Sequence, residues 1–152
     1  MNILAIDPGK RTGYYKENGI GSCYGVMDGD DVVECGTLIS GWTFPFVIVV
    51  EDQFRCRMTR QQEKTFHRRR YTWDILGSLY GIKVFDVLPN VWQSAFGLIE
   101  RTKKGDDKIT AREKKKRIVM AARLRSGLPL DMDEADAYFI HEYAVKYMDL
   151  EG

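Results

Sequence analysis

The sequence opens with MNILAIDPGK (residues 1–10), a short apolar run that ends at an acid, a proline and a glycine. An apolar run with turn residues directly behind it predicts a buried strand. A carboxylate at the end of such a strand is costly unless it is paired or binds a metal. Asp7 is therefore either the first residue of an Asx-type turn with Pro8 and Gly9, or a metal ligand at the end of a strand.

A second apolar segment also ends in an acid. Residues 45–50 are rich in β-branched side chains, which predicts a central strand that is buried on both faces, and Glu51 follows it directly. Two strand-ending acids at one edge of a sheet would be able to share a ligand.

The last predicted helix, residues 132–148, supplies a further pair of acids. Asp133 and Asp136 are three residues apart and so share one helix face. Asp131 and Glu134 fit a capping box, which explains both of them structurally. The helix dipole also favours Asp133 in the first turn, whereas Asp136 stands between two alanines and has less of a structural explanation.

Four carboxylates, Asp7, Glu51, Asp133 and Asp136, therefore form a candidate metal site without histidine or cysteine. Oxygen ligands alone favour Mg²⁺ or Mn²⁺ over zinc. Two such ions about 4 Å apart suit in-line attack of water on a phosphodiester.

Composition limits the class of protein. The 152 residues are enough for one domain (1–152), and 44% hydrophobic with 30% charged residues is typical of a soluble globular protein. We expect no membrane span, because no apolar stretch approaches the required ~20 residues, and no signal peptide. Three cysteines without CxxC spacing predict free thiols in a reducing compartment, the cytoplasm.

Charge is unevenly distributed. Segments 54–70 and 101–125 together hold 18 of the 23 basic residues and only 4 of the 22 acids. A basic surface beside an acid-rich patch suits a metal-dependent enzyme that acts on nucleic acid. The alternative is two helices whose charged outer faces are simply solvated.

The order of predicted elements indicates an α/β layer architecture. We expect three antiparallel strands in the first 40 residues, including a hairpin at 25–36, and then the strand that ends at Glu51. Further expected elements are a helix at 58–80 with Gly81 as its C-cap, a strand at 82–88, and helices at 91–98, 109–125 and 132–148. Trp42, Trp73 and Trp92 are predicted core residues, His67 a surface residue, and His141 a packed or solvated one.

Four motifs in this order resemble those of the RuvC-like Holliday junction resolvases of the retroviral-integrase/RNase H superfamily. They are DPG (7–9) with TGY (12–14), VEDQF (50–54), VLPNVW (87–92) and DEADA (133–137). The resemblance implies an RNase H-like fold, namely a central mixed sheet with three antiparallel N-terminal strands and flanking helices. Because the chain is short, it is most similar to a compact, phage-type member.

The resemblance also implies an activity: a homodimer that cleaves four-way or otherwise branched DNA by paired nicks and leaves 5′-phosphate ends. The four acids would bind two Mg²⁺ ions, with Mn²⁺ as a substitute, and no small-molecule cofactor is expected. Lys115 matches a catalytic lysine near the scissile phosphate, although the four consecutive basic residues 114–117 leave its register open.

Several residues are candidates for DNA contacts. Phe54 matches an aromatic that stacks at the junction centre, or else it packs under the following helix. Basic side chains would bind phosphates without sequence preference. The DNA-binding candidates are Phe54, Arg55, Arg57, Arg60, Arg68, Arg69, Arg70, Lys103, Lys104, Lys114 and Lys116.

Other functions stay open at this point. A YqgF-like RNA nuclease or RNase H relative shares the opening motif and the size. An ATPase-like nucleotide-binding fold is disfavoured, because the chain lacks a second glycine-rich phosphate loop. A non-catalytic DNA-binding module would use the acids only as caps and turns. The arginine-rich helix departs from the family pattern and leaves the dimer contact open.

Overall fold

The computed structural model describes residues 2–41, 46–52, 59–99 and 110–151. A five-stranded mixed sheet forms its centre, with strands in the order β3-β2-β1-β4-β5. β2 runs antiparallel to β1 and β3, whereas β4 is parallel to β1 and β5 is parallel to β4. The strands are β1 (Asn2–Asp7), β2 (Arg11–Asn18), β3 (Gly21–Asp28), β4 (Phe46–Glu51) and β5 (Val84–Val87). The predicted α/β sheet with three antiparallel N-terminal strands is confirmed.

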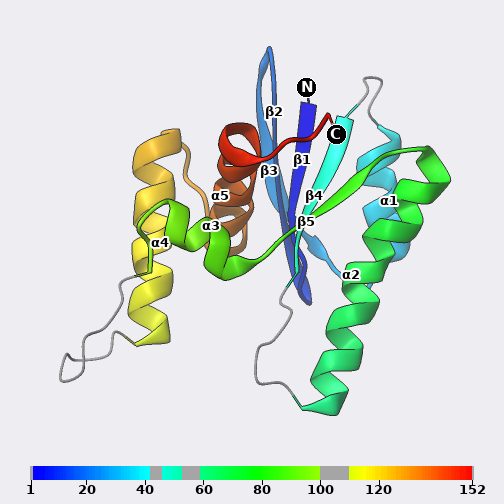
Figure 1. The fold of residues 1–152 in the computed structure, drawn as a ribbon, viewed down its shortest axis with the longest axis horizontal. Coiled ribbons are helices and arrows are strands. Elements are labelled where there is room, and N and C mark those ends of the chain that lie inside the picture. The colour runs from blue at the N-terminus through cyan, green and yellow to red at the C-terminus, as the bar shows by residue number, and fades with distance from the viewer. Residues whose placement is uncertain (1, 42–45, 53–58, 100–109, 152) are drawn as a thin grey trace.

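Helices cover both faces of the sheet (Figure 1). They are α1 (Val32–Ser40), α2 (Arg60–Tyr80), α3 (Pro89–Ala95), α4 (Ala111–Ser126) and α5 (Met132–Tyr147). Helices α1 and α2 lie on one side, and α3, α4 and α5 lie on the other. No helix in the described part of the chain is long and apolar enough to cross a membrane.

The central strands β1 and β4 contribute side chains to two separate hydrophobic cores, one on each face of the sheet, because successive side chains in a strand point to opposite faces. Ile3 and Ala5 pack with residues of α3, α4 and α5. Leu4 and Ile6 pack instead with residues of α1 and α2. Every residue of β4 is buried, which confirms the prediction from its β-branched sequence.

The predicted hairpin at 25–36 is wrong in its second half. Strand β3 ends at Asp28, and helix α1 begins at Val32. The Asp31 side chain accepts a hydrogen bond from the backbone N–H of Glu34 at 3.0 Å, so the acidic residues cap a helix instead of forming a hairpin turn. Cys35 and Ile39, four residues apart, are both buried against the sheet, as a helix requires.

The other helices keep their predicted places with shifted ends. Gly81 has φ +67° and its N–H donates to the Gly77 carbonyl, so the predicted C-cap of α2 is confirmed. Pro89 does not only stop β5 but also starts α3, where its fixed φ suits the first helical position. Leu79 and Leu124 lie in the predicted helices 58–80 and 109–125, and both side chains are exposed.

Candidate active site

The four predicted acids meet at one edge of the sheet. Asp7 is the last residue of β1 and Glu51 the last of β4, and these parallel strands pair up to Ile6 opposite Val50. The first two turns of α5 carry Asp133 and Asp136 to the same place, where both act electrostatically on Asp7. The structure therefore brings together acids that are up to 129 positions apart in the sequence.

The carboxylates are placed where charge is unfavourable. Asp7 is 9% exposed and Glu51 is 3% exposed. Burial, and then repulsion by Glu51, Asp136 and Asp133, raise the pKa of Asp7 well above its usual range. Burial, followed by repulsion from Glu51, raises the pKa of Asp136 to about 7. Without a cation, the cluster therefore holds protons that ordinary aspartates would have lost.

The carboxylate oxygens of the four acids do not all converge on one point. Within the described ranges, no three of these acids bring ligating oxygens within 4.8 Å of one another. The donor set consists of carboxylate oxygens alone, which are the ligands that Mg²⁺ and Mn²⁺ prefer. The residues present thus fit such ions by their chemistry and charge.

Lys115 lies on α4 beside the cluster. Its charge lowers the pKa of both Asp7 and Asp136, against the larger effect of burial. The side chain is exposed, as is that of Lys116, and Lys114 is half-buried. The structure therefore brings the fifth predicted catalytic residue to the four acids.

Trp92 orients Glu51. Its indole Nε1–H donates to Glu51 Oε2 at 2.7 Å, and the ring is fully buried and stacks on Phe139 of α5. A hydrogen bond of this length fixes the orientation of the Glu51 carboxyl group. Sequence reasoning took Trp92 only as a core residue. The available signal was its position in VLPNVW, directly after the strand beside the one that ends at Glu51.

Arg11 orients Asp133 and was also missed. Its Nε donates to Asp133 Oδ2 at 3.2 Å, and its Nη2 donates to Asp131 Oδ2 at 3.3 Å. Exposed ion pairs contribute at most about 1 kcal/mol to stability, so the main effect of Arg11 is on geometry. It ties the start of β2 to the first turn of α5, where the predicted Asp131–Glu134 capping box is confirmed.

Gly13 allows α5 to approach the sheet. It lies opposite Asp7 in the β1–β2 register, and a Cβ at this position would stand 2.1 Å from the backbone oxygen of Asp133. Any side chain here would push Asp133 away from Asp7. The TGY motif therefore has a steric meaning that the sequence alone did not reveal.

The arginines of α2 are less available for DNA contacts than the sequence predicts. Arg60 is exposed at the start of the helix. Arg68 and Arg69 both pair with Asp30, at 3.1 and 2.9 Å. Arg70 is buried and pairs with Asp74 and Asp86, so its guanidinium is held inside the protein. Five of the predicted DNA contacts lie outside the described residues: Phe54, Arg55, Arg57, Lys103 and Lys104.

Comparison with known proteins supports the fold. No protein-family model and no curated protein matches the chain. Among solved structures, Thermus thermophilus RuvC in complex with Holliday junction substrate is 17% identical, with a TM-score of 0.69 over 97% of this chain and 94% of that one. Another structure of Thermus thermophilus RuvC is 15% identical, with a TM-score of 0.56 over 96% of each chain. The chain therefore has the RuvC fold, which confirms the resemblance at the level of the fold.

We expect Gly13→Ala to lower the free energy of unfolding by about 2 kcal/mol, because the new methyl group overlaps the Asp133 backbone. Urea denaturation measures the change. Gly21→Ala is the matched control. Gly21 lies in β3 of the same sheet, and a Cβ at this position would meet no atom within 4 Å. Equal stability of the two variants would contradict the steric role of Gly13.

The raised pKa values predict a pH dependence of stability. In the unfolded chain Asp136 titrates near its ordinary value of 3.8, whereas in the folded chain it titrates at about 7. The folded protein holds the proton longer, so in chelator the free energy of unfolding falls as the pH rises from about 4 to about 7.

Asp136→Asn removes this charge, and we expect it to stabilise the metal-free protein at pH 8 by on the order of 2 kcal/mol. At pH 5 the gain should be smaller. Urea denaturation in chelator at both pH values tests this, with the exposed Asp149→Asn as control. A gain that is the same at both pH values would show that charge repulsion is not its cause.

Proposed function

We propose that this protein is a Mg²⁺-dependent endonuclease that cleaves branched DNA, with four-way junctions as the preferred substrate. The observation that carries the proposal is the convergence of Asp7, Glu51, Asp133, Asp136 and Lys115 at one sheet edge. The RuvC fold supports the choice of substrate, because one structure of that fold is a complex with a Holliday junction substrate.

The four acids would hold two Mg²⁺ ions, or Mn²⁺ in their place. Divalent charge would offset the repulsion that raises the pKa of Asp7 and Asp136. When bound, such ions supply an activated water and stabilise the leaving oxygen of an in-line displacement. In-line attack that releases the 3′ oxygen leaves a 5′-phosphate.

The chain's own residues would prepare this reaction. Trp92 holds one oxygen of Glu51 in place, and Arg11 holds Asp133 against β2. Lys115 adds positive charge beside Asp7 and Asp136, where a scissile phosphate would meet the acids. Preorganised charge of this kind stabilises the negative charge that develops in the transition state.

Phosphate contacts would come from exposed basic residues of α2 and α4. Arg60 on α2 and Lys116 on α4 are exposed. Arg68 and Arg69 would have to exchange Asp30 for phosphate, and the buried Arg70 is left out of the proposed surface. A homodimer, with one acid cluster in each protomer, would give paired nicks across a junction.

A substrate panel tests the proposal directly. The protein is incubated with labelled four-way junction, Y-fork, linear duplex and RNA–DNA hybrid, in Mg²⁺ and in chelator. We expect paired, symmetric, metal-dependent nicks in the junction, with a dimer in sedimentation. Cutting confined to the RNA strand would instead assign an RNase H-type activity, and binding without cutting would leave a DNA-binding module.

Asp7→Asn should lower the cleavage rate by roughly a thousandfold or more, because it removes a ligand from the centre of the cluster. Junction binding should persist or strengthen, since one negative charge beside the phosphates is lost. Single-turnover cleavage and a gel-shift titration measure the two effects. Asp149→Asn, an exposed substitution away from the cluster, should cut normally. Normal cutting by Asp7→Asn would refute the assignment of the site.

A further inference from the structure

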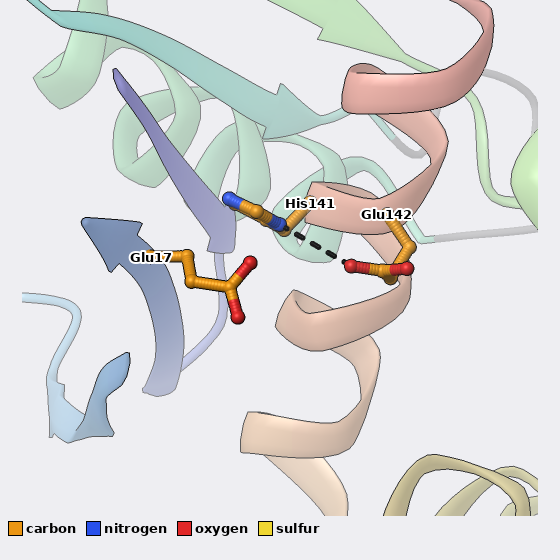
Figure 2. A group of neighbouring side chains, drawn as sticks. All are labelled: Glu17, His141 and Glu142. Atoms are coloured by element: carbon orange, nitrogen blue, oxygen red, sulfur yellow. Dashed lines mark ion pairs between the residues drawn. The ribbon is translucent and has the colours of Figure 1, made fainter. Parts of the chain in front are cut away.

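A second group of metal-ligating side chains lies between β2 and α5. Glu17 comes from β2, and His141 and Glu142 come from α5 (Figure 2). One potential ligand atom from each residue lies within 4.8 Å of the other two, and no other such group of three or more occurs within the described ranges. Two carboxylates and one imidazole thus face a common point.

His141 is the unusual member of this group. It is 3% exposed, and its Nδ1 has no hydrogen-bond partner among the described residues. Nδ1 is 3.7 Å from Glu142 Oε1 (the dashed line in Figure 2), which is within the range of an ion pair but too long for a hydrogen bond. A buried nitrogen without a partner costs about 1–3 kcal/mol, so a ligand that uses its lone pair would stabilise the fold.

The surroundings hold these side chains in place. The His141 ring packs edge-on against Tyr15, with the centroids 5.1 Å apart. The Tyr15 hydroxyl is hydrogen-bonded to Ser22 at 2.9 Å, and the Ser22 hydroxyl donates to Glu17 Oε1 at 3.5 Å. Partners of this kind orient metal ligands in known sites, and their loss typically weakens metal binding 10–100-fold.

This group is distinct from the acid cluster. His141 follows Asp136 by five residues on α5, which corresponds to about 7.5 Å along the helix and a rotation of about 140°. Glu17 is four residues beyond Gly13 on β2, or about 13 Å along the strand. An ion at one place could not share ligands with an ion at the other.

We propose that Glu17, His141 and Glu142 form a binding site for a divalent transition metal of the zinc class. Imidazole nitrogen favours Zn²⁺, Co²⁺ or Ni²⁺ over Mg²⁺, which prefers oxygen ligands alone. Three protein ligands leave the remaining position of a tetrahedral ion to water. The bound ion would clamp α5 to β2 and so fix the helix that carries Asp133 and Asp136.

Zinc binding by the full-length chain tests the proposal. Zn²⁺ is titrated by calorimetry in excess Mg²⁺, which occupies the acid cluster, and we expect one Zn²⁺ per chain and a rise in Tm. Glu17→Gln should weaken Zn²⁺ binding at least about tenfold. Because Glu17 is exposed, this variant should fold as the unchanged protein does.

Two controls locate the site. Glu63→Gln changes a glutamate that pairs with another histidine, His67, on the exposed part of α2, and it should keep full Zn²⁺ affinity. Asp7→Asn should keep it as well. Co²⁺ as a probe should shift the NMR signals of the His141 ring.

Three results would overturn the proposal: no Zn²⁺ uptake, equal affinity in Glu17→Gln and Glu63→Gln, or uptake that is lost in Asp7→Asn. The last result would place zinc at the acid cluster. Since the readout is metal binding, none of these outcomes decides whether the protein cleaves DNA.

Discussion

The close packing of α5 on β1 and β2 is the constraint on which both the core and the acid cluster depend. Helix α5 buries Ala137 and Ala144, which lie seven residues apart on one helix face, and small side chains on this face let the backbones approach. The approach is closest at Gly13, where even a Cβ would overlap the Asp133 backbone. If α5 stood farther from the sheet, two of the four carboxylates would leave the cluster, and the core beneath the helix would be underpacked.

This packing brings the acids of the cluster together where they are shielded from water, and the surrounding residues remove only part of the repulsion between them. Lys115 offsets part of it, while burial and neighbouring acids still raise the pKa of Asp7 and Asp136. Acids whose pKa values are raised by burial and by neighbouring acids are typical of functional sites. The supporting contacts, Trp92 to Glu51 and Arg11 to Asp133, fix carboxylate oxygens, and Arg11 also compensates the charge of Asp133 on the exposed side of the cluster.

The same helix connects the two proposed metal sites. Its first turns present acids to the sheet edge, and its middle presents His141 and Glu142 to β2. An ion at the second site would therefore stabilise the helix position on which the first site depends. The arginines of α2 show the opposite use of charge, because Arg69 and Arg70 form ion pairs with Asp30, Asp74 and Asp86 of the same chain. A count of basic residues overestimates the surface that is available to DNA.

The sequence by itself determined the strands, the order of the helices, the capping box at Asp131 and the four acids, because these follow from patterns within a few residues. It misassigned residues 32–36 because an acidic turn and a helix cap use the same residue types, and only the burial of Cys35 and Ile39 against the sheet decides between them. Trp92 contacts Glu51 across 41 positions and Arg11 contacts Asp133 across 122. The grouping of Glu17 with His141 and Glu142 likewise appears only when α5 is packed on β2. Local preferences cannot specify such contacts, because they exist only after the whole chain has closed around its core.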